Sequence, residues 1–135
     1  MKKTFSILIG FVASSITMMA FEFTNSLLFP FPADLDKQSL EQIRAFAAQM
    51  PLTSLVLVAC GWILGSTVGG YVSTKLSKTK SSATALTLGG VLTLFAGLNA
   101  WMIQNPLWFH VGGLPVFIIF SYLGFKLATH EKIFP

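Results

Sequence analysis

Four long apolar stretches, separated by short polar segments, fill most of this chain. They cover residues 5–29, 52–74, 82–103 and 107–128, and each reaches the roughly 20 residues that an α-helix needs to cross a bilayer. The stretches are continuous, whereas a membrane-spanning β-barrel has shorter strands in which apolar and polar residues alternate. The pattern therefore predicts an all-α protein, a bundle of four transmembrane helices in which residues 1–135 form a single domain.

A soluble four-helix bundle is the alternative architecture, and the composition disfavours it. Charged residues make up 10% of the chain and hydrophobic residues 53%. So few charged side chains cannot cover the outer faces of four helices. The short segments between the last three spans predict that the helices follow one another in up-down-up-down order.

The basic residues predict the orientation of the bundle. Of the nine Lys and Arg residues, only Lys37 and Arg44 lie in the loop between the first and second spans. The others precede the first span, separate the second from the third, or end the fourth: Lys2, Lys3, Lys75, Lys78, Lys80, Lys126 and Lys132. Because basic segments stay in the cytoplasm, we expect a multi-pass protein of a bacterial cell (inner) membrane with both termini cytoplasmic. This topology accounts for the net charge of +4, so we expect no nucleic-acid partner.

The first span also has features of a secretory signal peptide, since Lys2 and Lys3 precede an apolar run with small residues near Ala20. The run continues to Phe29, however. If a signal peptidase cut after Ala20, position −3 would be Met18, where a small residue is needed. We therefore expect a retained span.

A short amphipathic helix is predicted in the first external loop, over residues 36–49. The Pro-Phe-Pro sequence at residues 30–32 ends the first span, because proline cannot continue a helix. Asp36 is a possible N-cap, and Ser39 and Gln42 have the spacing of a capping box.

The apolar residues of this helix recur at helical intervals, which is typical of a helix lying on a membrane surface. In that interpretation Ile43 and Phe46 point into the membrane. The alternative is that the helix is a lid or a surface for docking a partner.

Two spans carry small residues at every fourth position. In the second span these are Gly61, Gly65, Gly69 and Ser73, and in the third they are Ala85, Gly89, Thr93 and Gly97. Small residues on one face let helix backbones approach closely, which is a main cause of helix association in lipid. We predict that these two consecutive helices pack tightly against each other. Homo-oligomerisation or docking onto a larger membrane protein through the same faces are the alternatives.

Glu22 is the only acidic residue within the spans, and an ionisable group there is costly enough to suggest a function. Counting about 1.5 Å per residue from Phe5 places it about 25 Å along a hydrocarbon core roughly 30 Å thick. Polar residues of all four spans fall at a similar depth: Asn25, Ser26, Thr53, Ser54, Asn99 and His110.

From these depths we predict an outward-facing cluster, centred on Glu22, Asn25, Ser26, Asn99 and His110, that binds a cation, a proton or a lipid head group. In the alternative interpretation Glu22 reaches surface water and His110 is an interfacial residue.

The start of the fourth span has two further features. An aromatic belt at the membrane surface is predicted for Trp101, Trp108 and Phe109. A kink or hinge is predicted at Gly112, Gly113 and Pro115, because proline lacks the amide that the carbonyl of Val111 needs.

The sequence shows no pattern typical of an enzyme. His110 and His130 lie near opposite ends of one span and cannot share a metal ion, and the spans contain no pair of acidic residues for acid–base catalysis. Cys60 has no histidine partner at its depth, and the glycines of residues 65–70 do not follow a strand, as a phosphate loop requires. We expect no catalytic residue, no metal and no cofactor.

Several of these motifs together resemble a family of small bacterial four-span membrane proteins of unassigned function. The resemblance rests on Glu22, the Pro-Phe-Pro sequence at residues 30–32, the glycine-rich helix at 62–70 and the Pro-Leu-Trp-Phe sequence at 106–109. That family often has histidine where this chain has Asn105. The resemblance implies the fold, a bacterial cytoplasmic membrane and an interest in Glu22, but no activity.

Two functions are compatible with the sequence. In the first, the protein is a non-catalytic accessory or assembly subunit that packs against a larger membrane complex through its glycine-rich or aromatic faces. In the second, it is a small oligomeric transporter or permeation unit in which Glu22 binds a proton or cation and the fourth span controls access. The expected partners are the lipid bilayer and either another membrane protein or further copies of this chain.

Overall fold

The computed structural model describes residues 2–30, 33–34, 36, 38–78, 81–103 and 107–130, and the described part of the chain is helical with no strand. The helices are α1 (Lys2–Leu28), α2 (Leu40–Ala48), α3 (Leu52–Ser77), α4 (Ala83–Ile103) and α5 (Leu107–His130). All but α2 are long and apolar enough to cross a membrane. The predicted all-α fold with four membrane-spanning helices is therefore confirmed.

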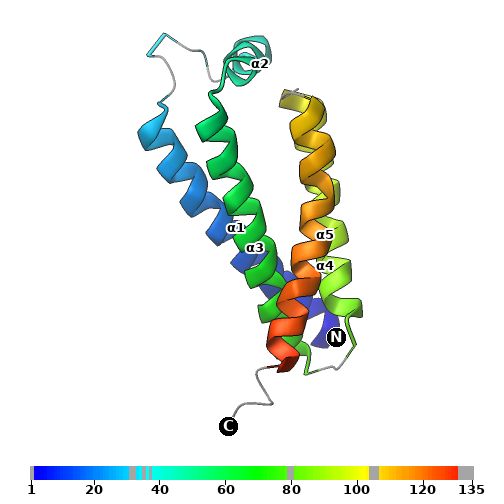
Figure 1. The fold of residues 1–135 in the computed structure, drawn as a ribbon. Coiled ribbons are helices and arrows are strands. Elements are labelled where there is room, and N and C mark those ends of the chain that lie inside the picture. The colour runs from blue at the N-terminus through cyan, green and yellow to red at the C-terminus, as the bar shows by residue number, and fades with distance from the viewer. Residues whose placement is uncertain are drawn as a thin grey trace.

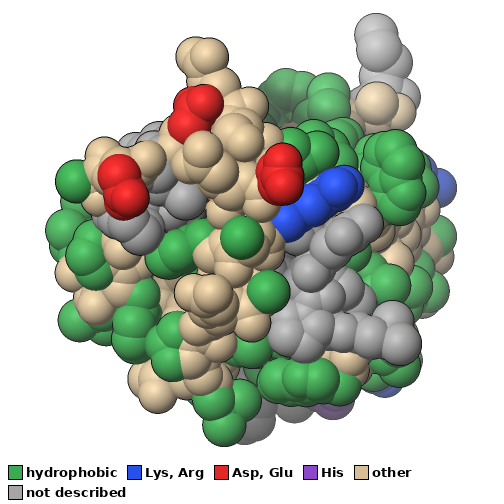
Figure 2. Space-filling view, turned by 90° about the horizontal axis from the view of Figure 1, so that it is seen from above, with side chains coloured by type: hydrophobic (Ala, Val, Ile, Leu, Met, Phe, Trp, Pro, Cys, Tyr) green, Lys and Arg blue, Asp and Glu red, His purple; other side chains and the backbone are tan. Residues whose placement is uncertain are grey.

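The four long helices run alternately up and down, so the start of α1 and the end of α5 lie at the same end of the bundle (Figure 1). The short helix α2 lies at the opposite end. Many large apolar side chains point outward, among them Ile16, Leu27 and Leu94, which are 63%, 66% and 67% exposed. Seen from the α2 end, hydrophobic side chains surround the bundle (Figure 2). An apolar exterior of this kind suits a lipid environment rather than water.

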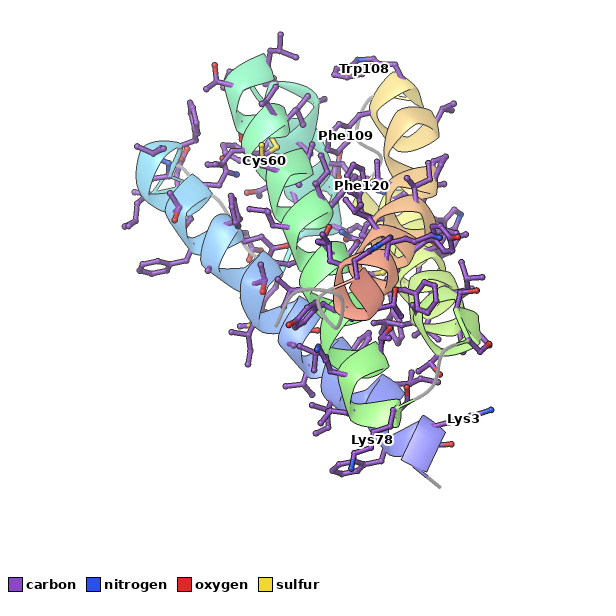
Figure 3. The ribbon with its side chains drawn as sticks, turned by 60° about the horizontal axis from the view of Figure 1, so that its bottom comes forward. Lys3, Cys60, Lys78, Trp108, Phe109 and Phe120 are labelled. Carbon is purple, nitrogen blue, oxygen red and sulfur yellow. The ribbon has the colours of Figure 1, made fainter. Side chains whose placement is uncertain are left out.

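Lys3 and Lys78 lie at the end of the bundle opposite Trp108 (Figure 3). The described lysines thus follow the alternation from which the orientation was predicted. The side chains of Lys2, Lys37, Lys80 and Lys132 lie outside the described residues. That the lysine-rich end faces the cytoplasm stays a prediction.

The glycine face of α3 packs on α1. A Cβ atom added to Gly61 would lie 2.8 Å from the Cβ of Phe21, and one added to Gly65 would lie 2.7 Å from Cγ of Met18. One added to Gly69 would lie 2.9 Å from the carbonyl oxygen of Gly10. This face, predicted to pack on α4, thus packs mainly on α1, and α4 reaches it at Gly69, where an added Cβ would lie 2.9 Å from Cδ2 of Leu88.

The reason lies in α1, which offers small residues of its own at matching positions. Gly10 is so close to α3 that an added Cβ would lie 2.8 Å from the Cβ of Ser73, and the buried Ser14 lies beside Gly69. Two small faces allow a closer backbone approach than one small face against larger side chains. That α4 follows α3 directly in the chain therefore does not decide which helix covers the glycine face of α3.

Helix α5 packs on both α3 and α4. Gly70 of α3 lies against the backbone of Ser121, and Gly124 of α5 lies against the backbone of Thr67. Gly89 of α4 also faces α5: a Cβ added to it would lie 2.9 Å from Cα of Ile118.

The other small residues of α4 behave differently from one another. The hydroxyl of Thr93 lies 3.5 Å from the carbonyl oxygen of Leu114 in α5, and Ala85 is fully buried. Among the described residues, no atom outside its own stretch of helix lies within 4 Å of a Cβ added to Gly97, so no described helix packs against it.

These close contacts belong largely to one half of the bundle. In that half Leu88 and Phe117 are nearly fully buried, and the rings of Phe11 in α1 and Phe95 in α4 lie 5.5 Å apart. Toward the α2 end, the pair α1–α3 and the pair α4–α5 spread apart (Figure 1).

Helix α2 begins later than predicted. Ser39 is its N-cap and accepts a hydrogen bond from the backbone N–H of Gln42, so the helix starts at Leu40 and not at Asp36. The backbone N–H of Asp36 donates to Oε1 of Gln42, and its carboxylate accepts from the backbone N–H of Gln38. Asp36 therefore belongs to the turn before the helix.

Helix α5 is continuous through Pro115. Gly112 has open space beside it, whereas Gly113 lies against the indole ring of Trp62. Gly113 thus has a packing role, and a kink or hinge at this place stays a prediction.

Replacing Gly70 by alanine should lower the free energy of unfolding by about 1–3 kcal/mol, because the new methyl group meets the rigid backbone of α5 at Ser121. The matched control is Gly90→Ala, which places a methyl group in open space and should change stability by less than about 1 kcal/mol. Unfolding in mixed detergent micelles of increasing sodium dodecyl sulfate content measures the free energy of unfolding of both variants. Equal stability of the two would contradict the inferred contact.

Candidate functional site

A cavity of about 400 Å³ lies where the helices spread apart, and all five helices contribute to its wall. We call it the Glu22 cavity. Its polar lining is Glu22, Asn25, Ser26 and Asn99, and its apolar lining is Phe29, Ile43, Phe46, Ala47, Met50, Leu55, Val58, Trp62 and Phe109.

The structure brings most of the predicted polar cluster to this one cavity. Glu22, Asn25 and Ser26 come from α1, and Asn99 comes from α4. The hydroxyl of Ser26 donates to the carbonyl oxygen of Phe23 in its own helix. The side chain of His110 lies outside the described residues, so its place in the cluster stays a prediction.

Asn25 is fixed by a partner in α3. The hydroxyl of Ser54 donates to Oδ1 of Asn25 at 2.8 Å. Ser54 is fully buried and Asn25 is 8% exposed, so this bond is shielded from solvent. It joins α1 to α3 at the open end of the bundle, beyond the glycine contacts.

Glu22 lines the cavity without a described hydrogen-bond partner. Among the residues that the structure describes, none donates a hydrogen bond to its carboxylate or forms an ion pair with it. The side chain is exposed, as a group that faces a cavity must be. Since Glu22 belongs to a span, a bound cation would offset part of the cost of an ionised carboxylate in the membrane.

A shallower groove of about 190 Å³ continues from the cavity toward the closed end of the bundle. We call it the α1–α4 groove, because most of its lining comes from these two helices: Phe11, Ser15 and Met18 of α1, and Leu92, Phe95 and Ala96 of α4. It shares Glu22, Trp62 and Asn99 with the Glu22 cavity. These shared residues therefore mark where the two spaces meet.

Trp62 is the aromatic centre of the site. Its ring centroid lies 4.9 Å from that of Phe109 and 5.2 Å from that of Phe117, both in α5. Gly113 has no side chain and so leaves room for the indole ring. The three rings form a continuous aromatic wall from the cavity to the groove.

The position of Phe109 corrects part of the predicted aromatic belt. Trp101 and Trp108 are 75% and 59% exposed, as residues of a belt must be, whereas Phe109 is 5% exposed and packs inside the bundle. Phe109 is next to Trp108 in a helix, so the two side chains point in different directions. Trp108 therefore faces outward, and Phe109 faces Trp62.

Helix α2 covers the cavity. Ile43 and Phe46, predicted to enter the membrane surface, line the cavity instead, together with the buried Ala47. Nε of Arg44 donates to the backbone carbonyl oxygen of Met102 at 2.6 Å. The last carbonyl groups of a helix have no partner within it, so Arg44 satisfies one at the end of α4 and holds α2 over the opening.

Acidic side chains gather on the face of the molecule that carries α2 (Figure 2). Asp34, Asp36 and Glu41 are exposed there. Negative groups near the cavity attract cations and repel anions. Within the described residues, no three His, Cys, Asp or Glu side chains come together as a possible metal site.

Comparison with known proteins gives no family: no protein-family model, no curated protein and no solved structure matches this chain. The resemblance to small four-span bacterial proteins therefore stays a prediction.

Sequence reasoning missed the apolar part of the site. Trp62 was noted only as the start of a glycine-rich helix, and Gly113 only as a possible hinge. Their pairing across α3 and α5 has no signal in a single sequence, because it depends on the rotation of both helices. Ser54 was placed at the correct depth, but its bond to Asn25 could not be foreseen.

Removing the Asn25–Ser54 bond should destabilise the open end of the bundle. In a double-mutant cycle of Asn25→Ala and Ser54→Ala, we expect a coupling energy of about 0.6 kcal/mol, the average for such bonds between membrane helices. Thr53→Ala, an exposed neighbour, is the control and should show no coupling to Asn25→Ala. Additive effects of the first pair would mean that the bond contributes nothing.

Replacing Arg44 by methionine should free α2, because the carbonyl group of Met102 loses its donor. We expect faster hydrogen exchange at the backbone amides of residues 40–48, with exchange in α3 unchanged. Ala45→Gln, an exposed change in the middle of the same helix, should leave the exchange of α2 as it is. An unchanged rate in the arginine variant would show that α2 is held by other contacts.

Proposed function

We propose that this protein is a multi-pass membrane protein of the bacterial cell membrane that binds a positively charged organic molecule in the Glu22 cavity. The observation that carries the proposal is the position of Glu22. Glu22 lines both the cavity and the groove, and it belongs to a membrane span. A bound cation would stabilise the ionised form of this group.

The shape of the molecule supports binding from one side. The cavity lies at the α2 end, while the opposite half is closed by backbone contacts such as those of Gly70 and Gly124 with neighbouring helices. A pore that is always open needs an opening at both ends, so the arrangement of this single chain supports a binding site with one opening more than such a pore. With the termini in the cytoplasm, as the lysines at the closed end favour, the cavity lies in the outer leaflet.

The accessory-subunit hypothesis loses support at the glycine-rich faces but keeps its aromatic face, where Trp101 and Trp108 are exposed. Docking onto a larger complex through the glycine-rich faces requires them to be uncovered. Gly61, Gly65 and Gly69 are instead covered by α1 of the same chain, and Gly89 is covered by α5.

The test uses butyltrimethylammonium with a photoreactive diazirine on its chain, added to protein purified in non-ionic maltoside micelles. After irradiation, mass spectrometry measures the captured probe and its place in the chain. We expect capture at residues of the cavity wall, and a drop of about tenfold or more in Glu22→Gln, which corresponds to about 1.4 kcal/mol of binding free energy.

Two controls accompany this experiment. Glu41→Gln removes a carboxylate that is exposed outside the cavity wall, and it should keep the capture of the native protein. An uncharged probe of the same size should not respond to Glu22→Gln. Equal capture of the cationic probe by the native protein and Glu22→Gln would refute the proposal.

A further inference from the structure

We infer that the ligand is a single-chain amphiphile with an alkylated ammonium head, seated with its head beside Glu22 and its alkyl chain in the α1–α4 groove. This inference rests on the proposed function and specifies its substrate class. It follows from the way in which charge, aromatic rings and apolar surface are distributed along the two connected spaces.

The head group is indicated by the surroundings of Glu22. A metal cation needs several oxygen ligands, and the cavity offers few of them: besides Glu22, only Asn25, Ser26 and Asn99 are polar among its described lining residues, and Oδ1 of Asn25 accepts from Ser54. An alkylated ammonium needs one counter-charge and aromatic faces, since ring faces attract such cations. Glu22 supplies the charge, and Trp62 and Phe109 supply the rings.

The alkyl chain is indicated by the groove. Beyond Glu22 the groove is lined mainly by apolar side chains, and it ends near the ring contact of Phe11 with Phe95. The helical rise gives roughly 16 Å between the levels of Glu22 and Phe11, which suits an extended chain of about a dozen carbons. A polar or compact ligand would leave this apolar surface unused.

The direction of the two spaces fits an amphiphile in a bilayer. The head lies toward the α2 end and the chain points toward the middle of the membrane, as in the surrounding lipid. Because α2 covers the end of the cavity and Arg44 holds it there, the side between α1 and α4 is the direct route of entry from the lipid. The ligand would reach the site from the leaflet and not from water.

The test compares the butyl probe with dodecyltrimethylammonium that carries the diazirine at the end of its chain. We expect the long probe to label α1 near Phe11 and α4 near Phe95, and the butyl probe to label the cavity wall near Trp62. Glu22→Gln should lose both labels. Ala96→Phe narrows the groove at a lining residue, and it should lose the label near Phe11 while keeping capture of the butyl probe.

Capture of the butyl probe by Ala96→Phe also shows that this variant is folded. Leu98→Phe is its matched control, an exposed position two residues further along α4 that lines neither space. It should keep both labels.

Two results would overturn the inference. If the butyl probe is captured through Glu22 but the long probe labels lipid-facing positions outside the groove, such as Val56 or Ile119, the site binds a cation without a chain, and only this inference fails. If neither probe depends on Glu22, the proposed function fails together with it.

Discussion

Close backbone contact at glycine is the constraint on which the rest of this structure depends. Gly69 and Gly70 of α3 touch α1 and α5 respectively, so one short segment holds three helices together. In lipid, where burial of apolar surface gives little reason for helices to associate, such contacts are a main source of stability. They also fix where the helices meet most closely, and the divergence of the two helix pairs from that place creates the cavity.

The fold could be predicted from the sequence because its causes are local. Span length and lysine distribution are properties of single segments, and both describe the structure well. The partner of each helix face could not be predicted, because it depends on complementary small residues in distant segments. The row from Gly61 to Gly69 was correctly identified as a packing face, but its partner is α1, where Gly10 and Ser14 provide the matching surface.

The same distinction applies to the site. Depth along a span can be counted, and it brought Glu22, Asn25, Ser26 and Asn99 together correctly. The rotation of a helix about its axis cannot be derived from the sequence of a span that is apolar on every side, since no polar stripe marks which face points inward. Phe109 was therefore assigned to the membrane surface together with Trp108, although it packs against Trp62.

The two halves of the bundle differ in what separates their helices. In the closed half backbone lies on backbone, as at Gly70, and in the open half the aromatic wall around Trp62 stands between α3 and α5. A contact between two backbones has no rotamer to change, whereas the side chains of the aromatic wall can change rotamer. The backbones therefore fix the distance between the α1–α3 pair and the α4–α5 pair in the closed half. In the open half, the size of the side chains between the two pairs sets the angle at which the pairs diverge.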